Sequence, residues 1–279
     1  MSKVVYLVPT PIGNLEDITL RALRVLNSVD IILCEDTRHA LKLLNHFGIK
    51  KHLISFEKFS EARRIEKIML FLDEGKSVAL VSNAGIPGIS DPGARLVSIA
   101  HERGIKVEAL PGACAFVTAI SGSGFTGPFR FIGFFPRKKG LARKEIARMA
   151  VSEEIAIFYE SPRRVIKTLT CIYDLLGDRR VCIARELTKV YEEYMIGSVS
   201  EVIARLKSMN NIGEVTILVD GVKTDRSLNS QIIEKRARSL LNAGYSKRDI
   251  LDILVKETVY SRNKIYKMLL EVTNKNEDQ

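Results

Sequence analysis

Short apolar runs alternate with segments of helical periodicity up to residue 110 of the chain. The runs are rich in Val, Ile and Leu, as is typical of strands buried on both faces. The predicted strands are 4–8, 31–34, 78–81 and 107–110. The segments between them repeat apolar residues at helical spacing, and the predicted helices are 15–26, 40–47, 65–72 and 94–103. Strands that alternate with helices predict a mostly parallel sheet covered on both faces.

The next hundred or so residues have a different pattern, in which some strands follow one another without a helix between them. The predicted strands are 130–135, 155–159, 180–184, 191–197 and 215–219, and the predicted helices are 165–176 and 199–209. The basic segment 137–143 is predicted to be a loop. Because adjacent strands form hairpins, this half favours a mixed sheet. We therefore predict two α/β domains of distinct topology, 1–113 and 114–222.

The last segment, 223–279, is predicted to form a small helical unit. Helices are expected over 231–243 and 250–256 and after Ser261, and Ser246 with Asp249 forms a potential capping box. Three short helices with a glycine turn resemble a helix-turn-helix unit. This segment holds twelve Lys and Arg against eight Asp and Glu. It either contacts nucleic acid or packs as a helical cap, and the sequence leaves both interpretations open.

The charge balance of the 279-residue chain favours a polyanionic partner, because its formal net charge is +10. The four cysteines form no CxxC pair and the four histidines show no ligand spacing, so we predict neither a disulfide framework nor a metal site. The N-terminal apolar run is too short for a signal peptide. The uncharged stretch 109–129 is interrupted by Gly and Pro and does not indicate a membrane span. We expect a cytoplasmic protein.

A long loop of small residues follows the predicted strand 78–81. It reads Ser-Asn-Ala-Gly-Ile-Pro-Gly-Ile-Ser-Asp-Pro-Gly over 82–93, and Asp91 is its only acid. Such a loop exposes backbone groups and lets a ligand approach closely. In α/β sheets, ligands bind outside the carboxyl ends of the strands. The loop is therefore either a ligand site or an ordinary turn between a strand and a helix.

Charged residues follow several other predicted strands. Since loops after parallel strands gather at one end of a sheet, these side chains could surround one cleft; they are Glu35, Asp36, Arg38, Glu160, Arg185, Glu186 and Lys189. The alternative is that they form structural ion pairs. Neither a GxGxxG fingerprint after the first strand nor a GxxxxGK[ST] loop is present, which disfavours ordinary dinucleotide binding and P-loop hydrolysis.

Six motifs occur in a characteristic order over nearly the whole chain: VPTPIGNLEDIT, EDTR, SNAGIPGISDPGARL, LPGACA, FYESPRR and RELTKVYEE. Together they resemble the ribosomal small subunit methyltransferase I group of the tetrapyrrole-methylase (class III) superfamily. The usual family pattern has Asp where this chain has Asn83, and it has Pro-Gly-Pro-Ser-Ala where this chain has Pro-Gly-Ala-Cys-Ala at 111–115. An Asn keeps the hydrogen-bonding carbonyl but loses the charge.

The resemblance implies two α/β domains with S-adenosylmethionine in the cleft between them, a homodimer, and 2′-O-methylation of a cytidine in 16S rRNA of the small ribosomal subunit. The cofactor-binding residues it implies are Pro11, Gly13, Ser82, Asn83, Ala84, Gly85, Pro87, Pro111, Gly112, Ala113, Cys114, Ala115, Glu160, Leu187 and Gly213. Six arginines and lysines suit contacts to RNA phosphates: Arg38, Arg137, Lys138, Arg163, Arg164 and Arg185.

Methyl transfer to a ribose hydroxyl requires alignment of the reacting atoms and removal of a proton. A carboxylate or a lysine of lowered pKa could accept that proton, and the sequence does not choose among Glu35, Asp36, Glu186 and Lys189. Two other classes of function stay open. One is a related methylase acting on a tetrapyrrole or a protein side chain, and the other is an RNA-binding protein without enzymatic activity.

Overall fold

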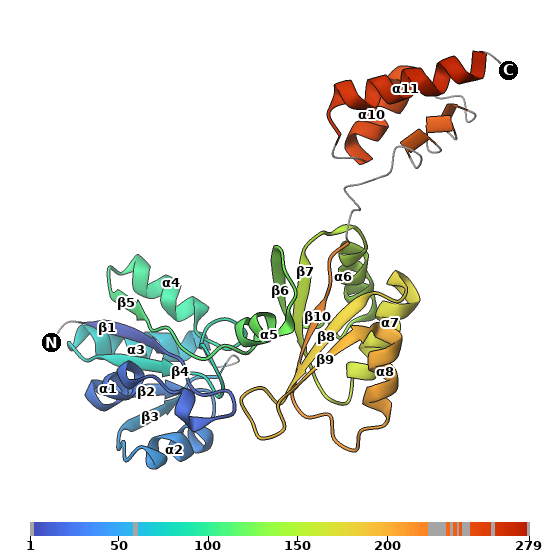
Figure 1. The fold of residues 1–279 in the computed structure, drawn as a ribbon. Coiled ribbons are helices and arrows are strands. Elements are labelled where there is room, and N and C mark those ends of the chain that lie inside the picture. The colour runs from blue at the N-terminus through green and yellow to red at the C-terminus, as the bar shows by residue number, and fades with distance from the viewer. Residues whose placement is uncertain are drawn as a thin grey trace. The chain divides into compact units, whose positions relative to one another are not determined.

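The computed structural model describes residues 3–57, 61–222, 233–234, 237–238, 240–241, 246–257 and 260–277. The chain divides into two compact units, Met1–Gly221 and Val222–Gln279 (Figure 1). The predicted fold class is confirmed, because the first unit carries a parallel and a mixed α/β sheet and the second is helical. The predicted domain boundaries at 113 and 222 stay predictions.

The first sheet is entirely parallel, as predicted. Its strand order is β3-β2-β4-β1-β5. The strands are β1 (Val4–Val8), β2 (Ile31–Cys34), β3 (His52–Ser55), β4 (Val78–Val81) and β5 (Lys106–Ala109). The central position of β4 explains its run of four buried apolar residues, since side chains on both of its faces are covered.

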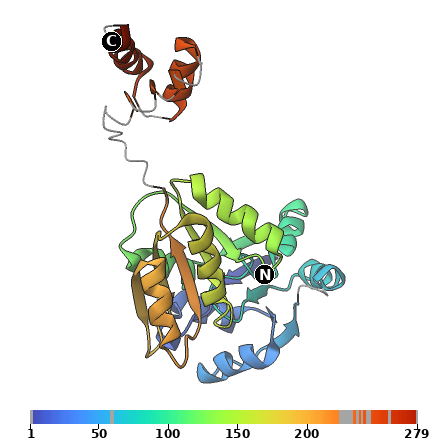
Figure 2. The ribbon, with the colours of Figure 1, turned by 90° about the vertical axis from the view of Figure 1, so that its right-hand side faces the viewer.

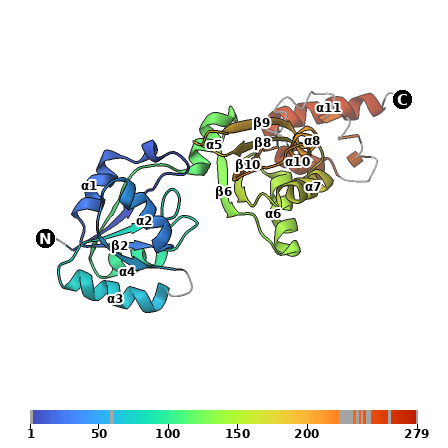
Figure 3. The same cartoon turned by 90° about the horizontal axis from the view of Figure 1, so that it is seen from below.

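Helices cover both faces of this sheet (Figure 3). Apolar side chains of α1 and α2 pack on one face, and those of α3 and α4 pack on the other. The helices are α1 (Leu20–Ser28), α2 (Thr37–His46), α3 (Glu61–Asp73) and α4 (Ala94–Glu102). This two-sided cover leaves the loops at the carboxyl ends of the strands free to build a site.

The second sheet is mixed, in the order β6-β7-β10-β8-β9. β6 and β7 are parallel and the other pairs are antiparallel. The strands are β6 (Phe129–Phe134), β7 (Ile155–Glu160), β8 (Arg180–Arg185), β9 (Glu193–Ser198) and β10 (Val215–Val219). One face is covered by three helices (Figure 2), which are α6 (Lys139–Val151), α7 (Val165–Leu176) and α8 (Val199–Lys207). The other face packs against α5 (Ala115–Ser123).

Two local predictions are wrong. The basic segment 137–143 is a loop only as far as Lys138, because α6 begins at Lys139 and places Ile146 and Met149 in the core. The predicted helix 15–26 is two elements, a 3-10 turn η1 (Leu15–Asp17) and α1. The break occurs because the Thr19 side chain accepts a hydrogen bond from the Ala22 N–H and caps α1 there.

The second unit contains α10 (Lys247–Glu257) and α11 (Arg262–Glu277). Ser246 accepts a hydrogen bond from the Asp249 N–H at 3.2 Å, in keeping with the predicted cap. Most of the predicted helix 231–243 lies outside the described residues, although Ile233, Ala237 and Leu240 are buried in the core of this unit. Among the described residues, no helix is both long and apolar enough to cross a membrane.

Candidate functional site

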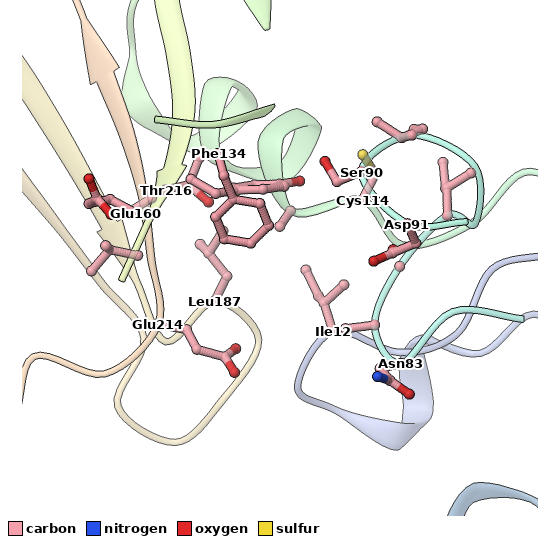
Figure 4. Close-up of a pocket in the computed structure, with 18 of the residues that line it drawn as sticks. Ile12, Asn83, Ser90, Asp91, Cys114, Phe134, Glu160, Leu187, Glu214 and Thr216 are labelled. Carbon is pink, nitrogen blue, oxygen red and sulfur yellow. The ribbon is translucent and has the colours of Figure 1, made fainter. Parts of the chain in front are cut away.

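A cavity of about 430 Å³ lies in the first unit, between the loops of the two sheets. Figure 4 shows Ile12, Asn83, Ser90, Asp91 and Cys114 on one side and Phe134, Leu187 and Glu214 on the other. Its volume lies within the range of small-molecule sites. The cavity therefore has one wall from each sheet, which are called here the parallel-sheet wall and the mixed-sheet wall.

Backbone hydrogen bonds hold the centre of the parallel-sheet wall. The N–H groups of Thr10 and Gly85 each donate to the other's carbonyl oxygen at 3.0 Å. The Ser82 hydroxyl donates to the Gly85 carbonyl at 2.7 Å, and the Thr10 hydroxyl donates to the Ser82 carbonyl at 3.1 Å. Gly85 has a φ of +79°, and a Cβ there would lie 3.3 Å from the Ala113 carbonyl oxygen. The loop is thus fixed with its backbone close to the cavity.

Three polar side chains gather on the same wall. The Asn83 amide donates to a Glu35 carboxylate oxygen at 3.3 Å. Burial and the nearby Glu35 charge raise the pKa of Asp91 above its usual value. An Asp at position 83 would face Glu35 with a second negative charge, whereas Asn83 donates a hydrogen bond to it. The amide thus removes one like-charge repulsion from an acidic corner of the cavity.

The mixed-sheet wall is fixed by side chains instead. Glu160, only 4% exposed, accepts hydrogen bonds from the Ser161 N–H at 2.8 Å and the Thr168 hydroxyl at 2.7 Å. Arg164 forms an ion pair with it at 3.2 Å and also donates to the Pro136 carbonyl. A carboxylate with this many donors is a fixed structural group.

The loop after β8 connects the two walls. Glu186 and Thr188 have φ angles of 48° and 64°, in the left-handed region. The Asn14 N–H donates to the Thr188 hydroxyl at 3.0 Å. A Cβ at Gly13 would lie 2.6 Å from Lys189 Cγ, so only glycine allows this approach. The strained backbone of this loop is therefore held against the loop after β1.

Lys189 bridges two carboxylates, Glu186 at 3.1 Å and Glu214 at 3.0 Å. Burial alone would lower the pKa of Lys189, but its two acidic partners hold it above its usual value. Burial alone would raise the pKa of Glu186, yet the Glu214 N–H and the Lys189 ammonium lower it. Both groups are consequently charged at neutral pH and form an ion pair with each other.

Aromatic rings complete the mixed-sheet wall. Phe134 and Tyr159 line the cavity, and their rings meet edge to face with centroids 5.5 Å apart. Phe131 also contacts Tyr159 edge to face, with ring centroids 5.0 Å apart. Burial, followed by the neighbouring Cys114, raises the pKa of Tyr159 to about 12, so its hydroxyl stays neutral. This wall therefore offers an apolar, uncharged surface beside its ion pairs.

The structure brings together only part of the predicted cofactor-binding set. Seven of these residues line the cavity: Asn83, Ala84, Gly85, Cys114, Ala115, Glu160 and Leu187. The others lie in the same loops or beside them without lining it: Pro11, Gly13, Ser82, Pro87, Pro111, Gly112, Ala113 and Gly213. Three of them instead contact neighbouring loops: the Ser82 carbonyl accepts from the Thr10 hydroxyl, Gly13 lies against the loop after β8, and Gly112 is tight against Pro9.

The four predicted proton acceptors have separate environments. Glu35 lines the cavity. Asp36 caps the N-terminus of α2, where the Arg38 side chain and N–H lower its pKa. Glu186 and Lys189 are ion-paired to each other. Of the four, Glu35 alone is placed to meet a ligand within the described cavity.

The predicted RNA-binding residues also separate into two groups. Arg38, Arg137, Lys138 and Arg163 are exposed. Arg164 is held by Glu160, as described above. Arg185 is 8% exposed and donates to the carbonyls of Ile212 and Asn211 as well as pairing with Glu193. Arg164 and Arg185 are therefore occupied by protein groups and are unsuited to phosphate contacts.

Several lining residues were not predicted, among them Ile12, Phe134, Tyr159, Glu214 and Thr216. Glu214 and Thr216 come from the start of β10, an antiparallel strand, so the rule for loops after parallel strands does not find them. Tyr159 lies within the FYESPRR motif, whereas the only sequence signal for Phe134 is its place near the end of a predicted strand. Among the described residues, no cluster of His, Cys, Asp and Glu could hold a metal ion.

The sequence profile of the Tetrapyrrole (Corrin/Porphyrin) Methylases matches residues 4–203. The chain belongs to this family. A Thermotoga maritima protein named ribosomal RNA small subunit methyltransferase I is 46% identical over 222 residues, which are 79% of this chain and 99% of that protein. A protein of the same name from Micromonospora olivasterospora is 38% identical over 98% of this chain and 88% of its own. The resemblance found in the motifs is thereby confirmed.

Other tetrapyrrole methylases share the fold. The crystal structure of cobalt precorrin-4 methyltransferase, a cobalamin biosynthetic enzyme, matches with a TM-score of 0.60 and 15% identity, over 78% of this chain and 95% of that one. The Thermotoga maritima alignment accounts for nearly the whole relative, yet leaves about a fifth of this chain unmatched. The unmatched part of this chain is about as long as the second unit, so that relative lacks a segment of this length.

Proposed function

We propose that this methyltransferase transfers the methyl group of S-adenosylmethionine to the 2′-hydroxyl of a cytidine ribose in 16S rRNA of the small ribosomal subunit. The observation that carries the proposal is the cavity between the two walls, in a chain whose relatives at 38–46% identity are named ribosomal RNA methyltransferases. The net charge of +10 and the exposed cations near the cavity support an RNA substrate.

The residues of the cavity fit S-adenosylmethionine. A sulfonium and an ammonium group favour negative surroundings, and Glu35 and Asp91 lie on the parallel-sheet wall. Ile12, Ala184 and Leu187 supply apolar surface for the adenosine part. The Ser90 hydroxyl is buried and has no partner among the described residues, so a polar ligand group can satisfy it. Asn83 to Gly85, Cys114, Ala115 and Leu187 would hold the cofactor.

The bound cofactor supplies an activated methyl group, and the protein must position the ribose and take up its proton. Glu35 is our candidate proton acceptor, because it lines the cavity and its only hydrogen bond among the described residues is the one from Asn83 at 3.3 Å. Lys189 is unsuited, since its raised pKa keeps it protonated. Glu186 and Asp36 are held by other groups.

We also propose that the protein acts as a cytoplasmic homodimer, as the family resemblance implies. The exposed apolar side chains Val190, Tyr191 and Ile196 on and before β9 are consistent with a protein interface. Sedimentation of the purified protein tests the dimer, and a monomer at micromolar concentration would contradict it.

The test is transfer of radiolabelled methyl from S-adenosylmethionine to small subunits from a strain that lacks this enzyme. We expect label in 16S rRNA, recovered after nuclease digestion as 2′-O-methylcytidine. Label on a base, or on ribosomal protein, would contradict the proposed substrate. A methylase for tetrapyrroles would instead label a tetrapyrrole such as uroporphyrinogen, and label there in place of 16S rRNA would favour that alternative.

A further inference from the structure

Phe134 is an exposed aromatic residue in the lining of the cavity. Its side chain is 66% exposed although it ends a strand of the second sheet. Figure 4 shows its ring projecting from the mixed-sheet wall. Large exposed aromatic rings cost free energy in water, and they often mark binding surfaces. No other residue that lines the described cavity is an exposed aromatic side chain.

A β-bulge directs this ring into the cavity. In the β6–β7 ladder, Phe131 pairs with Ile157 and Phe134 pairs with Tyr159, so three steps on β6 match two on β7. Gly133, inside this irregularity, has a φ of +78°. Regular alternation would put Phe131 and Phe134 on opposite faces of the sheet. The bulge puts Phe131 and Phe134 on the same face of the sheet. On the opposite face, Phe135 packs against Phe158 in the core.

The exposed ring has an aromatic neighbour on its own sheet. Tyr159 meets Phe134 edge to face, with a centroid separation of 5.5 Å and an interplanar angle of 65°. Phe131 contacts Tyr159 in the same manner, at 5.0 Å and 67°. Such contacts stabilise aromatic pairs. Tyr159 therefore supports the Phe134 ring, while most of that ring stays accessible to a flat ligand.

Two exposed cations, Arg137 and Lys138, lie three and four residues after Phe134 in the chain. Arg137 and Lys138 are exposed and form no ion pair with any described residue, and the same holds for Arg163. Arg164 donates to the Pro136 carbonyl at 3.2 Å, which ties the loop carrying Arg163 to the segment carrying Arg137. A stacking surface beside free cations is the usual combination in proteins that bind single-stranded nucleic acid.

The opposite wall has a matching apolar group. Ile89, 47% exposed, lines the cavity from the loop after β4. A Cβ built on Gly133 would lie 3.9 Å from the Ser90 hydroxyl, so the bulge approaches that loop closely. The cavity therefore has an exposed apolar side chain on each wall, and the Ser90 hydroxyl is also part of its lining.

We propose that Phe134 stacks on the nucleobase of the RNA nucleotide to be methylated, while Arg137, Lys138 and Arg163 contact the phosphates that flank it. This inference rests on the proposed function, since it assigns the RNA side of the same cavity. Tyr159 acts as a positioning residue for the Phe134 ring. The ligand is an unpaired nucleotide, because the bases of an RNA duplex are stacked on each other.

The first test uses fluorescence, because the chain contains no tryptophan. Phe134→Trp places a single tryptophan at the stacking position, and Phe129→Trp places one at the other end of the same exposed strand, outside the cavity lining. A single-stranded oligoribonucleotide of the 16S rRNA sequence, added with S-adenosylhomocysteine, should quench Phe134→Trp saturably and leave Phe129→Trp unchanged. Equal response of the two variants would overturn the proposal.

The second test separates the RNA from the cofactor. Phe134→Ala should raise the concentration of small subunits that gives half-maximal methylation by about tenfold or more, as for loss of one base-stacking contact. Its calorimetric affinity for S-adenosylhomocysteine should equal that of the native protein, and Phe134→Trp should restore the methylation. Phe129→Ala is the matched control and should behave as the native protein.

Other outcomes overturn the assignment. Quenching of Phe134→Trp by S-adenosylhomocysteine alone, or weakened cofactor affinity in Phe134→Ala, would mean that the ring packs on the cofactor. Failure of the proposed function is a different result, because the native protein would then methylate no small subunit. In that case quenching of Phe134→Trp by the oligonucleotide still supports base stacking, and its absence rejects it.

Discussion

The two walls of the cavity are built by different means. The parallel-sheet wall consists of short loops whose backbone groups bond to each other, as between Thr10 and Gly85, and its acids have no cationic partner among the described residues. The mixed-sheet wall is fixed by side chains, with Glu160 held by Arg164 and Lys189 held by two carboxylates. One wall thus presents backbone and unpaired acids, and the other presents aromatic rings and ion pairs.

This difference suggests a division of the chemistry. A wall of close backbone and unpaired acids suits a cationic small molecule. A wall with exposed aromatic and cationic side chains suits RNA. We therefore assign the methyl donor mainly to the loops of the parallel sheet, with Ala184 and Leu187 of the mixed sheet beside its adenosine part, and the RNA to the exposed aromatic and cationic side chains of the mixed sheet. Substitutions on the two walls should then affect different ligands.

The largest expected effect is on the parallel-sheet wall. Gly85→Val should reduce S-adenosylmethionine affinity at least about a hundredfold, because the new side chain would meet the Ala113 carbonyl at 3.3 Å and the Ile12 side chain at 3.4 Å. Isothermal titration calorimetry measures the affinity, and circular dichroism checks that the chain is folded.

The matched control for that substitution is Gly48→Val. Gly48 also has a left-handed φ, +66°, but a Cβ there would have nothing within 4 Å. Valine at position 48 would have the same kind of backbone strain at a place away from the cavity, so the cofactor affinity of this variant should be unchanged. Equal loss of affinity in both variants would mean that the Gly85 effect is strain rather than close approach.

On the mixed-sheet wall, Glu160→Ala should lower the free energy of unfolding by about 2–3 kcal/mol. It removes a buried carboxylate and leaves the Thr168 hydroxyl and Arg164 without their partner. Urea unfolding measures the change. Glu74→Ala, which breaks the exposed Lys76–Glu74 pair, should cost less than about 1 kcal/mol. Similar costs would show that Glu160 is not a structural anchor.

Removal of the second unit should separate RNA binding from cofactor binding. A chain ending at Gly221 should keep its cofactor affinity, because the cavity belongs wholly to the first unit. Its affinity for 16S rRNA should fall by about tenfold, with a shallower salt dependence as phosphate contacts are lost. Filter binding at several salt concentrations measures both. Unchanged RNA affinity would make the second unit a packing element.

The smallest expected effect is a difference in pH dependence between the walls. The raised pKa of Asp91 means that the folded state binds a proton more tightly than the unfolded state. Stability is therefore lost as pH rises above about 3.8, the ordinary value. Asp91→Asn should accordingly raise the melting temperature at pH 7 and change it little at pH 3.5.

Glu186 should behave in the opposite way. Its lowered pKa contributes stability that is present above the ordinary value of 4.5 and is lost as pH falls through the folded-state pKa. Glu186→Gln should therefore cost about 1 kcal/mol at pH 7 and less at pH 3.5. Thermal unfolding from pH 3.5 to 8 compares the two variants. If both substitutions change the melting temperature at pH 7 in the same direction, the two walls do not differ in this respect.

Local sequence patterns predicted much of the fold. The strand 78–81 is found with the predicted bounds, because continuous apolar runs have few alternatives in a central strand. The helix beginning at Lys139 was missed because the segment 137–143 holds four cations and a glycine, a composition more typical of a loop. The strand β3 was missed because it is short and only partly buried.

The site was predictable where it depends on loops after parallel strands, as at Glu35 and Gly85. It was not predictable where residues distant in sequence meet. Lys189 lies between Glu186 and Glu214, a pairing that no local pattern shows. Phe134 faces the cavity only because a bulge changes the alternation of β6, and simple two-residue periodicity places it on the wrong face.

A crystal structure of the protein with S-adenosylhomocysteine tests the division between the two walls most directly. We expect the ligand in the cavity, with the backbone of Asn83 to Gly85 in contact with it and the Phe134 ring left free toward solvent. Density for the ligand stacked on Phe134, or at a site outside the cavity, would contradict the assignment of the methyl donor to the parallel-sheet wall.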